Sequence, residues 1–158
     1  LKIKTGYHIL IRNKSLNIGR NCMIPVMIND VPVDCINHAA VVYHVPATLI
    51  LAVIKKENGI NGQAVKNKNS TYDYGVMQIN DIWLTKIAAF CYTKNDIKYN
   101  ACKNVFVGTW ILAQSIAEGK DIWRGVGNYH SHTLVFNKSY KKSISVTYAK
   151  LTNVIYGG

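Results

Sequence analysis

The apolar positions of this chain repeat at helical spacing in several separate stretches. Between Pro46 and Glu57, Leu49 and Val53 lie four residues apart, and Glu57 follows Val53 by four more. Apolar residues at such spacing form one face of a helix, and proline suits the first turn because its φ is already helical. The pattern predicts a helix that opens at Pro46, carries Glu57 in its last turn and ends at Gly59 in a left-handed conformation.

Further helices are predicted from the same spacing and from capping residues. The uncharged stretch from Cys35 to Ile54 is long enough to span a membrane, but its polar residues and proline fit two short helices meeting at Val45–Pro46 better. Later helices are expected from Asn80 or Asp81 to about Phe90, from Asn100 to Glu118 before Gly119, from Asp121 through Tyr129, and through Ile144, Tyr148, Leu151 and Ile155. These elements indicate a mainly α fold.

The 158 residues suffice for one domain with a substantial core. Residues 1–30 mix short apolar runs with glycine and proline, which predicts an N-terminal extension in the form of a hairpin or an arm. The domain itself is expected to occupy residues 31–158. Within it, Asn67 to Thr71 is predicted to be an exposed loop.

Glu57 is the candidate for acid–base chemistry. Its carboxylate would lie at the negative end of the helix dipole and against apolar neighbours, and both disfavour the charged form and raise the pKa. A raised pKa suits a general acid. Taken alone, such a residue is more often an exposed glutamate paired with Lys55 or Lys56, because surface glutamates are common.

Four motifs that follow one another along the chain change this balance. They run from Glu57 to Val65, from Ser70 to Asn80, from Cys102 to Gln114 and from Trp123 to Tyr129. Together they resemble the lytic transglycosylases of the goose-lysozyme-like (SLT) superfamily, in particular the small specialised members that accompany secretion, pilus and conjugation machines. The resemblance covers residues 34–133 and implies a mainly α, lysozyme-like (SLT-type) single domain with a substrate cleft.

The resemblance implies a peptidoglycan lytic transglycosylase in which Glu57 is the catalytic residue. Glu57 would protonate the β-1,4 oxygen between N-acetylmuramic acid (MurNAc) and N-acetylglucosamine (GlcNAc). It would then act as base on the C6 hydroxyl of the same sugar, which gives a 1,6-anhydro-MurNAc product without water. This chemistry would open the cell wall locally during assembly of an envelope-spanning machine, and it needs no cofactor.

The resemblance also implies substrate contacts from the other motif residues. Gly75 would let the backbone approach the sugar, Gln78 would bind an acetamido group, and Tyr129 would hydrogen-bond Glu57. Each of these residue types is also common in turns or cores, and the apolar side chain of Met77 suits packing below the cleft. The full expected substrate-binding set is Asn58, Gly75, Met77, Gln78, Asn80, Tyr129 and His130.

Two of these residues depart from the family pattern, which has Ser at the position of Asn58 and Asn at that of His130. An amide can replace a hydroxyl as a hydrogen-bond donor. The larger, titratable imidazole of His130 would weaken sugar binding, add pH dependence or mark reduced activity. Two alternatives therefore stay open beside the transglycosylase: a hydrolytic lysozyme (muramidase), and a catalytically weak glycan-binding assembly subunit.

Asp73 bears on the lysozyme alternative because it is the other acid near the motifs. Glycoside hydrolases usually work with two carboxyl groups, and Asp73 would then position water. Its setting between two tyrosines, just before Gly75, instead favours an aspartate that bonds backbone N–H groups and shapes the turn.

Charge restricts the partners. With 19 basic and 8 acidic residues, the net charge of +11 predicts an anionic partner. Peptidoglycan glycan strands fit, because their stem peptides carry carboxylates. The basic residues are scattered and no nucleic-acid recognition motif is present, so no nucleic-acid partner is expected. The resemblance adds components of a secretion, pilus or conjugation apparatus as partners.

The cysteines indicate an exported protein. Cys22, Cys35, Cys91 and Cys102 make an even number that allows two disulfides outside the cytoplasm. The resemblance suggests that Cys35 lies near Cys102, which would leave Cys22 with Cys91, while local closure between Cys91 and Cys102 stays open. No cysteine pair has zinc-ligand spacing, so no metal is expected. No signal peptide is visible at Leu1 and no transmembrane segment is expected, so the chain is expected to be a mature or trimmed periplasmic or exported form.

Overall fold

The computed structural model describes residues 26–156, and most of these residues are helical. The predicted mainly α fold class is confirmed. The helices are α1 (Val33–Tyr43), α2 (Ala47–Glu57), α3 (Leu84–Ala88), α4 (Lys94–Tyr99), α5 (Ala101–Glu118), α6 (Ile122–His130) and α7 (Leu134–Tyr156), with a 3-10 turn η1 (Asp81–Trp83) before α3. The strands are β1 (Met27–Ile28) and β2 (Val31–Pro32), which pair with each other, and β3 (Ala64–Lys66), β4 (Tyr72–Tyr74) and β5 (Ile79–Asn80), which form an antiparallel sheet.

Helix α2 lies in the centre of the core because its first eight residues, Ala47 to Ile54, are all buried. A helix that is apolar on nearly all sides has to be surrounded by other elements. Helices α1 and α7 pack against it. Only the C-terminal end of α2, where Lys55, Lys56 and Glu57 follow the apolar run, reaches the surface.

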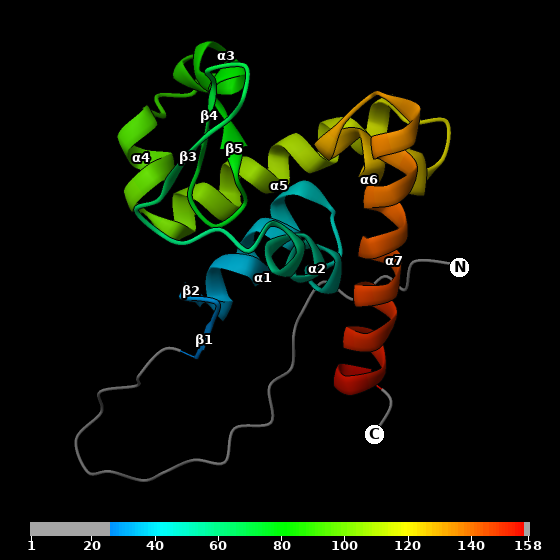
Figure 1. Cartoon of the computed structure of the whole chain (residues 1–158). Coiled ribbons are helices and arrows are strands. Elements are labelled where there is room, and N and C mark those ends of the chain that lie inside the picture. The colour runs from blue at the N-terminus through cyan, green and yellow to red at the C-terminus, as the bar shows by residue number, and fades with distance from the viewer. Residues whose placement is uncertain (1–25, 157–158) are drawn as a thin grey trace, which may run out of the picture.

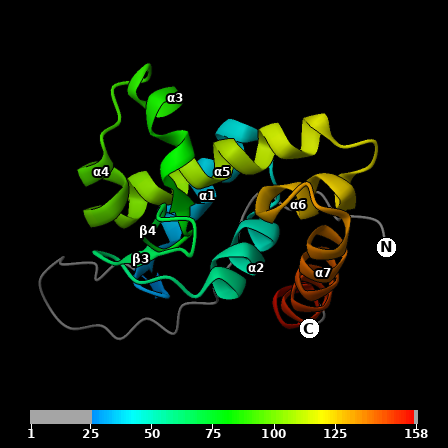
Figure 2. The same cartoon turned by 45° about the horizontal axis from the view of Figure 1, so that its top comes forward.

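The long helix α5 connects the two sides of the molecule (Figure 1). Helices α1 and α6 pack against α5, and α7 packs against both α6 and α2. The small sheet with α3 and α4 lies toward one end of α5, and α6 and α7 lie toward the other, as Figure 2 shows from a second direction. The core is continuous across these elements and includes Leu49, Leu112, Val126 and Ile144.

Capping residues set several helix boundaries as the sequence predicts. Asn100 and Asp121 accept hydrogen bonds from backbone N–H groups at the starts of α5 and α6, and α5 ends at Gly119. Two helices meet at Val45–Pro46, and the C-terminal helix buries Ile144 and Tyr148 on one face. These predictions are confirmed.

Two boundary predictions are wrong. Asn58, not Gly59, takes the left-handed conformation after α2, with a φ of 52°, which asparagine tolerates better than most residues. Gly59 is instead required by crowding, because a Cβ there would lie 2.0 Å from the Gly75 carbonyl oxygen. The helix expected from Asn80 to Phe90 is shorter, since it begins as the 3-10 turn η1 and ends at Ala88.

A disulfide joins α1 to α5 through Cys35 and Cys102, whose Cα atoms lie 5.3 Å apart. This is the pairing that the resemblance suggests, and it excludes the alternative between Cys91 and Cys102. Cys91 is exposed and has no disulfide partner within residues 26–156. Cys22 lies outside the described residues, so its pairing with Cys91 stays a prediction.

The N-terminal part of the described chain is a short hairpin. Asn29 and Asp30 connect β1 to β2 with φ values of 50° and 61°, as a two-residue turn with left-handed conformations requires. The rest of the predicted extension, residues 1–25, lies outside the described residues. In the part that the structure describes, no helix is both long and apolar enough to cross a membrane.

Candidate active site

Glu57 ends α2 at the surface of the core, and its carboxyl is partly buried. Burial raises the pKa of Glu57 from its usual value to about 7. The Asp73 carboxylate also raises it, whereas a hydrogen bond from Tyr140 and the charge of Lys56 act in the opposite direction. The raised pKa expected from the sequence is present, and at neutral pH both protonation states of Glu57 are therefore populated.

Tyr140 is the hydrogen-bond donor to this carboxyl. Its hydroxyl donates to Oε1 of Glu57 from α7, 83 residues later in the chain. The prediction that Tyr129 donates to Glu57 is wrong, because the Tyr129 hydroxyl donates to the Met77 backbone carbonyl at 2.8 Å. The rings of Tyr129 and Tyr140 stack with centroids 6.4 Å apart. Tyr129 thus lies beside the Tyr140–Glu57 pair and does not replace Tyr140 as the donor.

The His130 side chain covers Tyr140, the hydrogen-bond donor to Glu57. Its imidazole stacks on the Tyr140 ring with centroids 4.9 Å apart and an interplanar angle of 4°. Burial lowers the pKa of His130, Lys56 lowers it further, and the Asp73 carboxylate raises it. A histidine with a lowered pKa is mostly neutral at pH 7. His130 therefore contributes an uncharged aromatic wall beside Glu57.

The turn from Gly75 to Gln78 carries several motif residues and is shaped by two left-handed positions. Gly75 has a φ of 66° and Gln78 a φ of 50°. A Cβ at Gly75 would lie 2.3 Å from Nδ2 of Asn104, so glycine is required there for packing as well as for conformation. The Gln78 side chain donates to the Gly75 carbonyl at 2.8 Å and closes the turn.

Asn104 anchors this turn to α5. The side chain is fully buried. Its Oδ1 accepts the Met77 N–H at 2.9 Å, and its Nδ2 donates to the carbonyls of Tyr74 at 2.8 Å and of Ile97 at 2.7 Å. One amide therefore satisfies three buried backbone groups and fixes the turn against the helix.

Asp73 does not bond turn N–H groups as expected. It lies in β4, opposite Asn80 of β5, and its Oδ1 accepts a hydrogen bond of 2.6 Å from the Asn80 amide. The same Asn80 nitrogen donates to Oγ1 of Thr71 at 2.9 Å. Asp81, and not Asp73, is the aspartate that accepts a backbone hydrogen bond in this sheet, because its Oδ2 accepts the Tyr72 N–H at 2.6 Å. Asp73 is thus held by a side-chain amide and faces the same hollow as Glu57.

Two hollows meet at Glu57. The larger has a volume of about 440 Å³ and is lined by the end of α2, the β3–β5 sheet with its loops and η1, α5 and α6. Its lining residues are Glu57, Asn67, Asn69, Asp73, Gln78, Ile79, Asn80, Ile82, Trp83, Ile111, Tyr129 and His130. The smaller holds about 240 Å³ and is lined by Lys56, Glu57, His130, Phe136, Ser139 and Tyr140. Because both share Glu57 and His130, the carboxyl lies at the junction of one cleft.

The structure brings together most of the residues singled out from the sequence. Gln78, Asn80, Tyr129 and His130 line the cleft with Glu57. Gly75 and Met77 are buried and line neither hollow, so the Met77 side chain packs below the cleft, and Asn58 is exposed at the end of α2 outside both hollows. Within residues 26–156, no group of three His, Cys, Asp or Glu residues could hold a metal ion.

Two residues that position the site are missed from the sequence. Tyr140 lies four residues before Ile144 and eight before Tyr148, so the same apolar stripe of the C-terminal helix could have placed it on the buried face. Asn104 lies three residues after Ala101 and seven before Ile111, on the apolar face of α5, and a polar residue at a core position of a helix is a signal for a specific buried hydrogen bond.

The family model for the transglycosylase SLT domain matches residues 34–151. This range includes Glu57, the cleft residues of both hollows, the disulfide and most of α7. The chain belongs to the SLT transglycosylase family. The predicted lysozyme-like, SLT-type fold and the resemblance on which it depends are thereby confirmed.

Several curated proteins are similar to this SLT domain. Protein IpgF of Shigella flexneri is 32% identical over 101 residues, which are 63% of this chain and 66% of that protein, and IpgF of Shigella sonnei is 31% identical over 113 residues, 71% and 72% of the two chains. The invasion protein IagB of Salmonella typhimurium is 26% identical over 129 residues, 78% and 81% of the two chains. The SLT domain thus spans about two thirds or more of each of these relatives.

Proposed function

We propose that this SLT domain is a peptidoglycan lytic transglycosylase that cleaves the MurNAc-β-1,4-GlcNAc bond and leaves a 1,6-anhydro-MurNAc end. The observation that supports this most directly is a single carboxyl with a pKa of about 7 at the junction of a cleft. Membership of the SLT family supports peptidoglycan as the substrate.

The proposed reaction uses Glu57 twice. Tyr140 occupies Oε1, which leaves Oε2 to carry the proton toward the bond. Glu57 donates this proton to the glycosidic oxygen as the bond from C1 breaks, and the departing GlcNAc gains a 4-hydroxyl. The C6 hydroxyl of the MurNAc then attacks its own C1, and Glu57 takes back a proton. A group that is acid and then base works best with a pKa near the working pH.

The hydrolytic lysozyme is the second candidate, and Asp73 is the observation that favours it. Asp73 lines the same hollow as Glu57 and raises the pKa of Glu57 by its charge. Asn80 already occupies one Asp73 oxygen, and the other could orient a water molecule. Hydrolysis would leave a reducing MurNAc end instead of an anhydro end, so the two reactions differ in product.

A catalytically weak glycan-binding subunit is the third candidate. It is favoured by His130, which lines the cleft beside Glu57 where the family usually has Asn, and by a relative 26% identical over 132 residues that is named a peptidoglycan-binding-like protein in Escherichia coli O157:H7. Such a protein would bind glycan strands and release nothing.

The proposed setting is the periplasm or another exported location, where the wall is accessible and the Cys35–Cys102 disulfide is stable. The net charge of +11 suits a substrate with stem-peptide carboxylates. Similarity to an invasion protein supports a task in local wall opening during assembly of a secretion, pilus or conjugation apparatus. We also retain residues 1–30 as an extension to the catalytic domain.

The test is mass spectrometry of muropeptides released from purified sacculi by the wild type and by Glu57→Gln. Anhydro-muropeptides from the wild type alone would support the transglycosylase. Reducing-end muropeptides would identify a lysozyme, and Asp73→Asn should then abolish them. Release of nothing by a folded wild type that still sediments with sacculi would refute both enzymes and favour the binding subunit.

His130→Asn restores the residue usual in the family and serves as the matched variant for the third candidate. If His130 limits turnover, His130→Asn should release more product than the wild type from the same sacculi. Equal release by both proteins would show that the imidazole does not weaken this enzyme.

A further inference from the structure

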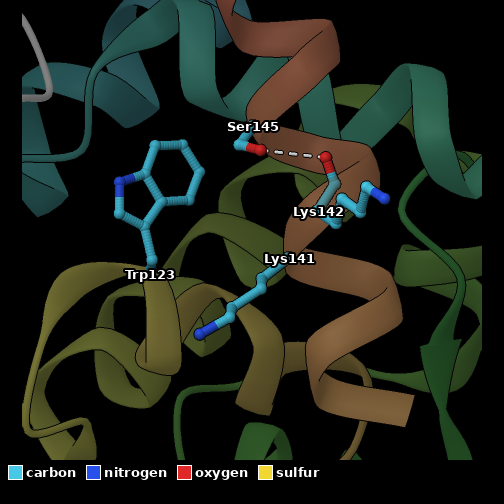
Figure 3. Close-up of a pocket in the computed structure, with 4 residues that line it drawn as sticks. All are labelled: Trp123, Lys141, Lys142 and Ser145. Carbon is cyan, nitrogen blue, oxygen red and sulfur yellow. Dashed lines mark hydrogen bonds between the residues drawn. The ribbon is translucent and has the colours of Figure 1, made fainter. Parts of the chain in front are cut away.

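A third hollow of about 360 Å³ lies between α6 and α7, apart from the cleft (Figure 3). It is lined by Trp123 of α6 and by Lys141, Lys142 and Ser145 of α7. None of these residues lines the two hollows at Glu57. The reaction proposed above leaves this hollow without a role.

Trp123 is held in a fixed position at this hollow. Its ring packs edge-on against the buried Tyr148, with centroids 6.0 Å apart and an interplanar angle of 74°. Figure 3 shows the indole on one side of the hollow and the side chain of Lys141 extending from α7 below it, whereas the ammonium of Lys142 points away from the indole. The hollow thus offers a braced aromatic surface beside one ammonium group.

The two helices that line the hollow carry basic residues and no acidic ones, and Asp121 caps the start of α6. Residues 122–156 contain Arg124, Lys138, Lys141, Lys142 and Lys150 and no aspartate or glutamate. In the described part of the chain, no carboxylate lies within ion-pair distance of Lys141. A ligand with an anionic group would therefore meet a cation that no protein carboxylate neutralises.

We propose that this hollow is a second peptidoglycan-binding site, which takes a stem peptide with a free carboxylate. An apolar peptide side chain or the adjoining sugar ring packs on Trp123, and the carboxylate pairs with Lys141. The proposal rests on peptidoglycan being the substrate. A site outside the cleft keeps the protein on the wall after the cleft has released a product.

The test measures binding of the protein to insoluble sacculi by co-sedimentation, in a Glu57→Gln background so that the sacculi stay intact. Trp123→Ala should weaken binding about tenfold, from the loss of a buried aromatic contact. Lys141→Glu should weaken it about fivefold, as expected for a partly exposed ion pair. Thermal unfolding confirms that each variant is folded, and Lys141→Glu carries the test if Trp123→Ala is unstable.

Lys150→Glu is the matched control. Lys150 lies nine residues after Lys141, which is two and a half helical turns and therefore the opposite face of α7. The same change of charge on this face should leave sacculus binding unchanged. Equal weakening by both reversals would overturn the proposal, because it would show a general effect of net charge.

Two further substrates identify the ligand. On strands from which an amidase has removed the stem peptides, Lys141→Glu should bind as well as its parent, and a persisting defect would overturn the stem-peptide assignment. If Lys141→Glu instead lost binding to phosphatidylglycerol vesicles and kept its binding to sacculi, the site would be a membrane contact.

With Glu57 intact, release of products from peptide-free strands should be the same with and without Lys141→Glu. A failure of the wild type to release any product would refute the enzyme and leave the binding site standing.

Discussion

Replacing Asn104 should destabilise the fold and the cleft together. In Asn104→Ala, the Met77 N–H and the carbonyls of Tyr74 and Ile97 lose their partner. Each hydrogen bond contributes about 1 kcal/mol net, and a buried group left unpaired costs about 1–3 kcal/mol. Allowing for partial relaxation, we expect the free energy of unfolding to fall by about 3–5 kcal/mol, which is a large part of a typical domain's stability.

The effect on stability is measured by urea unfolding followed by circular dichroism. We expect the midpoint to fall without a change of slope, because the surface exposed on unfolding stays the same. Activity on sacculi should fall too, measured at a urea concentration below the unfolding transition. The turn that Asn104 anchors holds Tyr129 through the Met77 carbonyl and contributes Gln78 to the cleft lining, so both side chains should lose their fixed positions.

Thr109→Val is the matched control on the same helix. The Thr109 hydroxyl is the buried side-chain group that has no hydrogen-bond partner in the described part of the chain, so an apolar residue of the same shape should be neutral or stabilising. The anchoring role of Asn104 would be refuted if the free energy of unfolding of Asn104→Ala were within about 1 kcal/mol of the wild-type value, or no lower than that of Thr109→Val.

Three other predictions concern Glu57, Tyr140 and the disulfide. The folded-state pKa of Glu57 is raised to about 7, so ionisation of this carboxyl destabilises the folded state. At pH 8.5 the free energy of unfolding of Glu57→Gln should therefore exceed that of the wild type by about 2 kcal/mol. Urea titrations at several pH values should show that this difference vanishes by about pH 4. Tyr140→Phe removes a hydrogen bond that lowers the Glu57 pKa, so the high-pH fall in cleavage rate should move to higher pH, and an unchanged pH–rate profile would contradict this. Cys35→Ser removes a disulfide between residues 67 apart and should lower the free energy of unfolding by about 4 kcal/mol. The reduced wild type should unfold at the same urea concentration as this variant. An oxidised wild type no more stable than either would show that the disulfide contributes nothing.

The helices could be predicted because their signals are local. The apolar run after Pro46 and the caps at Asn100 and Asp121 act within one or two turns of the chain. The end of α2 was missed by one residue because the choice between Asn58 and Gly59 depends on a distant group. Gly59 lies against the Gly75 carbonyl, and a local pattern does not contain that contact.

The catalytic candidate could be predicted, but its hydrogen-bond partner could not. Glu57 stands out through its place at the end of an apolar helix and through the motifs after it. The choice between Tyr129 and Tyr140 depends on how α6 and α7 cross over the end of α2, which helical periodicity does not determine. Asp73 was misassigned for the same reason, because its partner Asn80 is brought opposite by strand pairing.

The bond between Glu57 and Tyr140 also fixes when the candidate site can be completed. The two residues are 83 positions apart, and Tyr140 belongs to the last helix of the described chain. During synthesis, Glu57 is added to the growing chain 83 residues before Tyr140. Its carboxyl then has neither its hydrogen-bond donor nor the cleft wall that α7 supplies. The order of residues along the chain thus delays the assembly of the candidate site around Glu57 until α7 has been added.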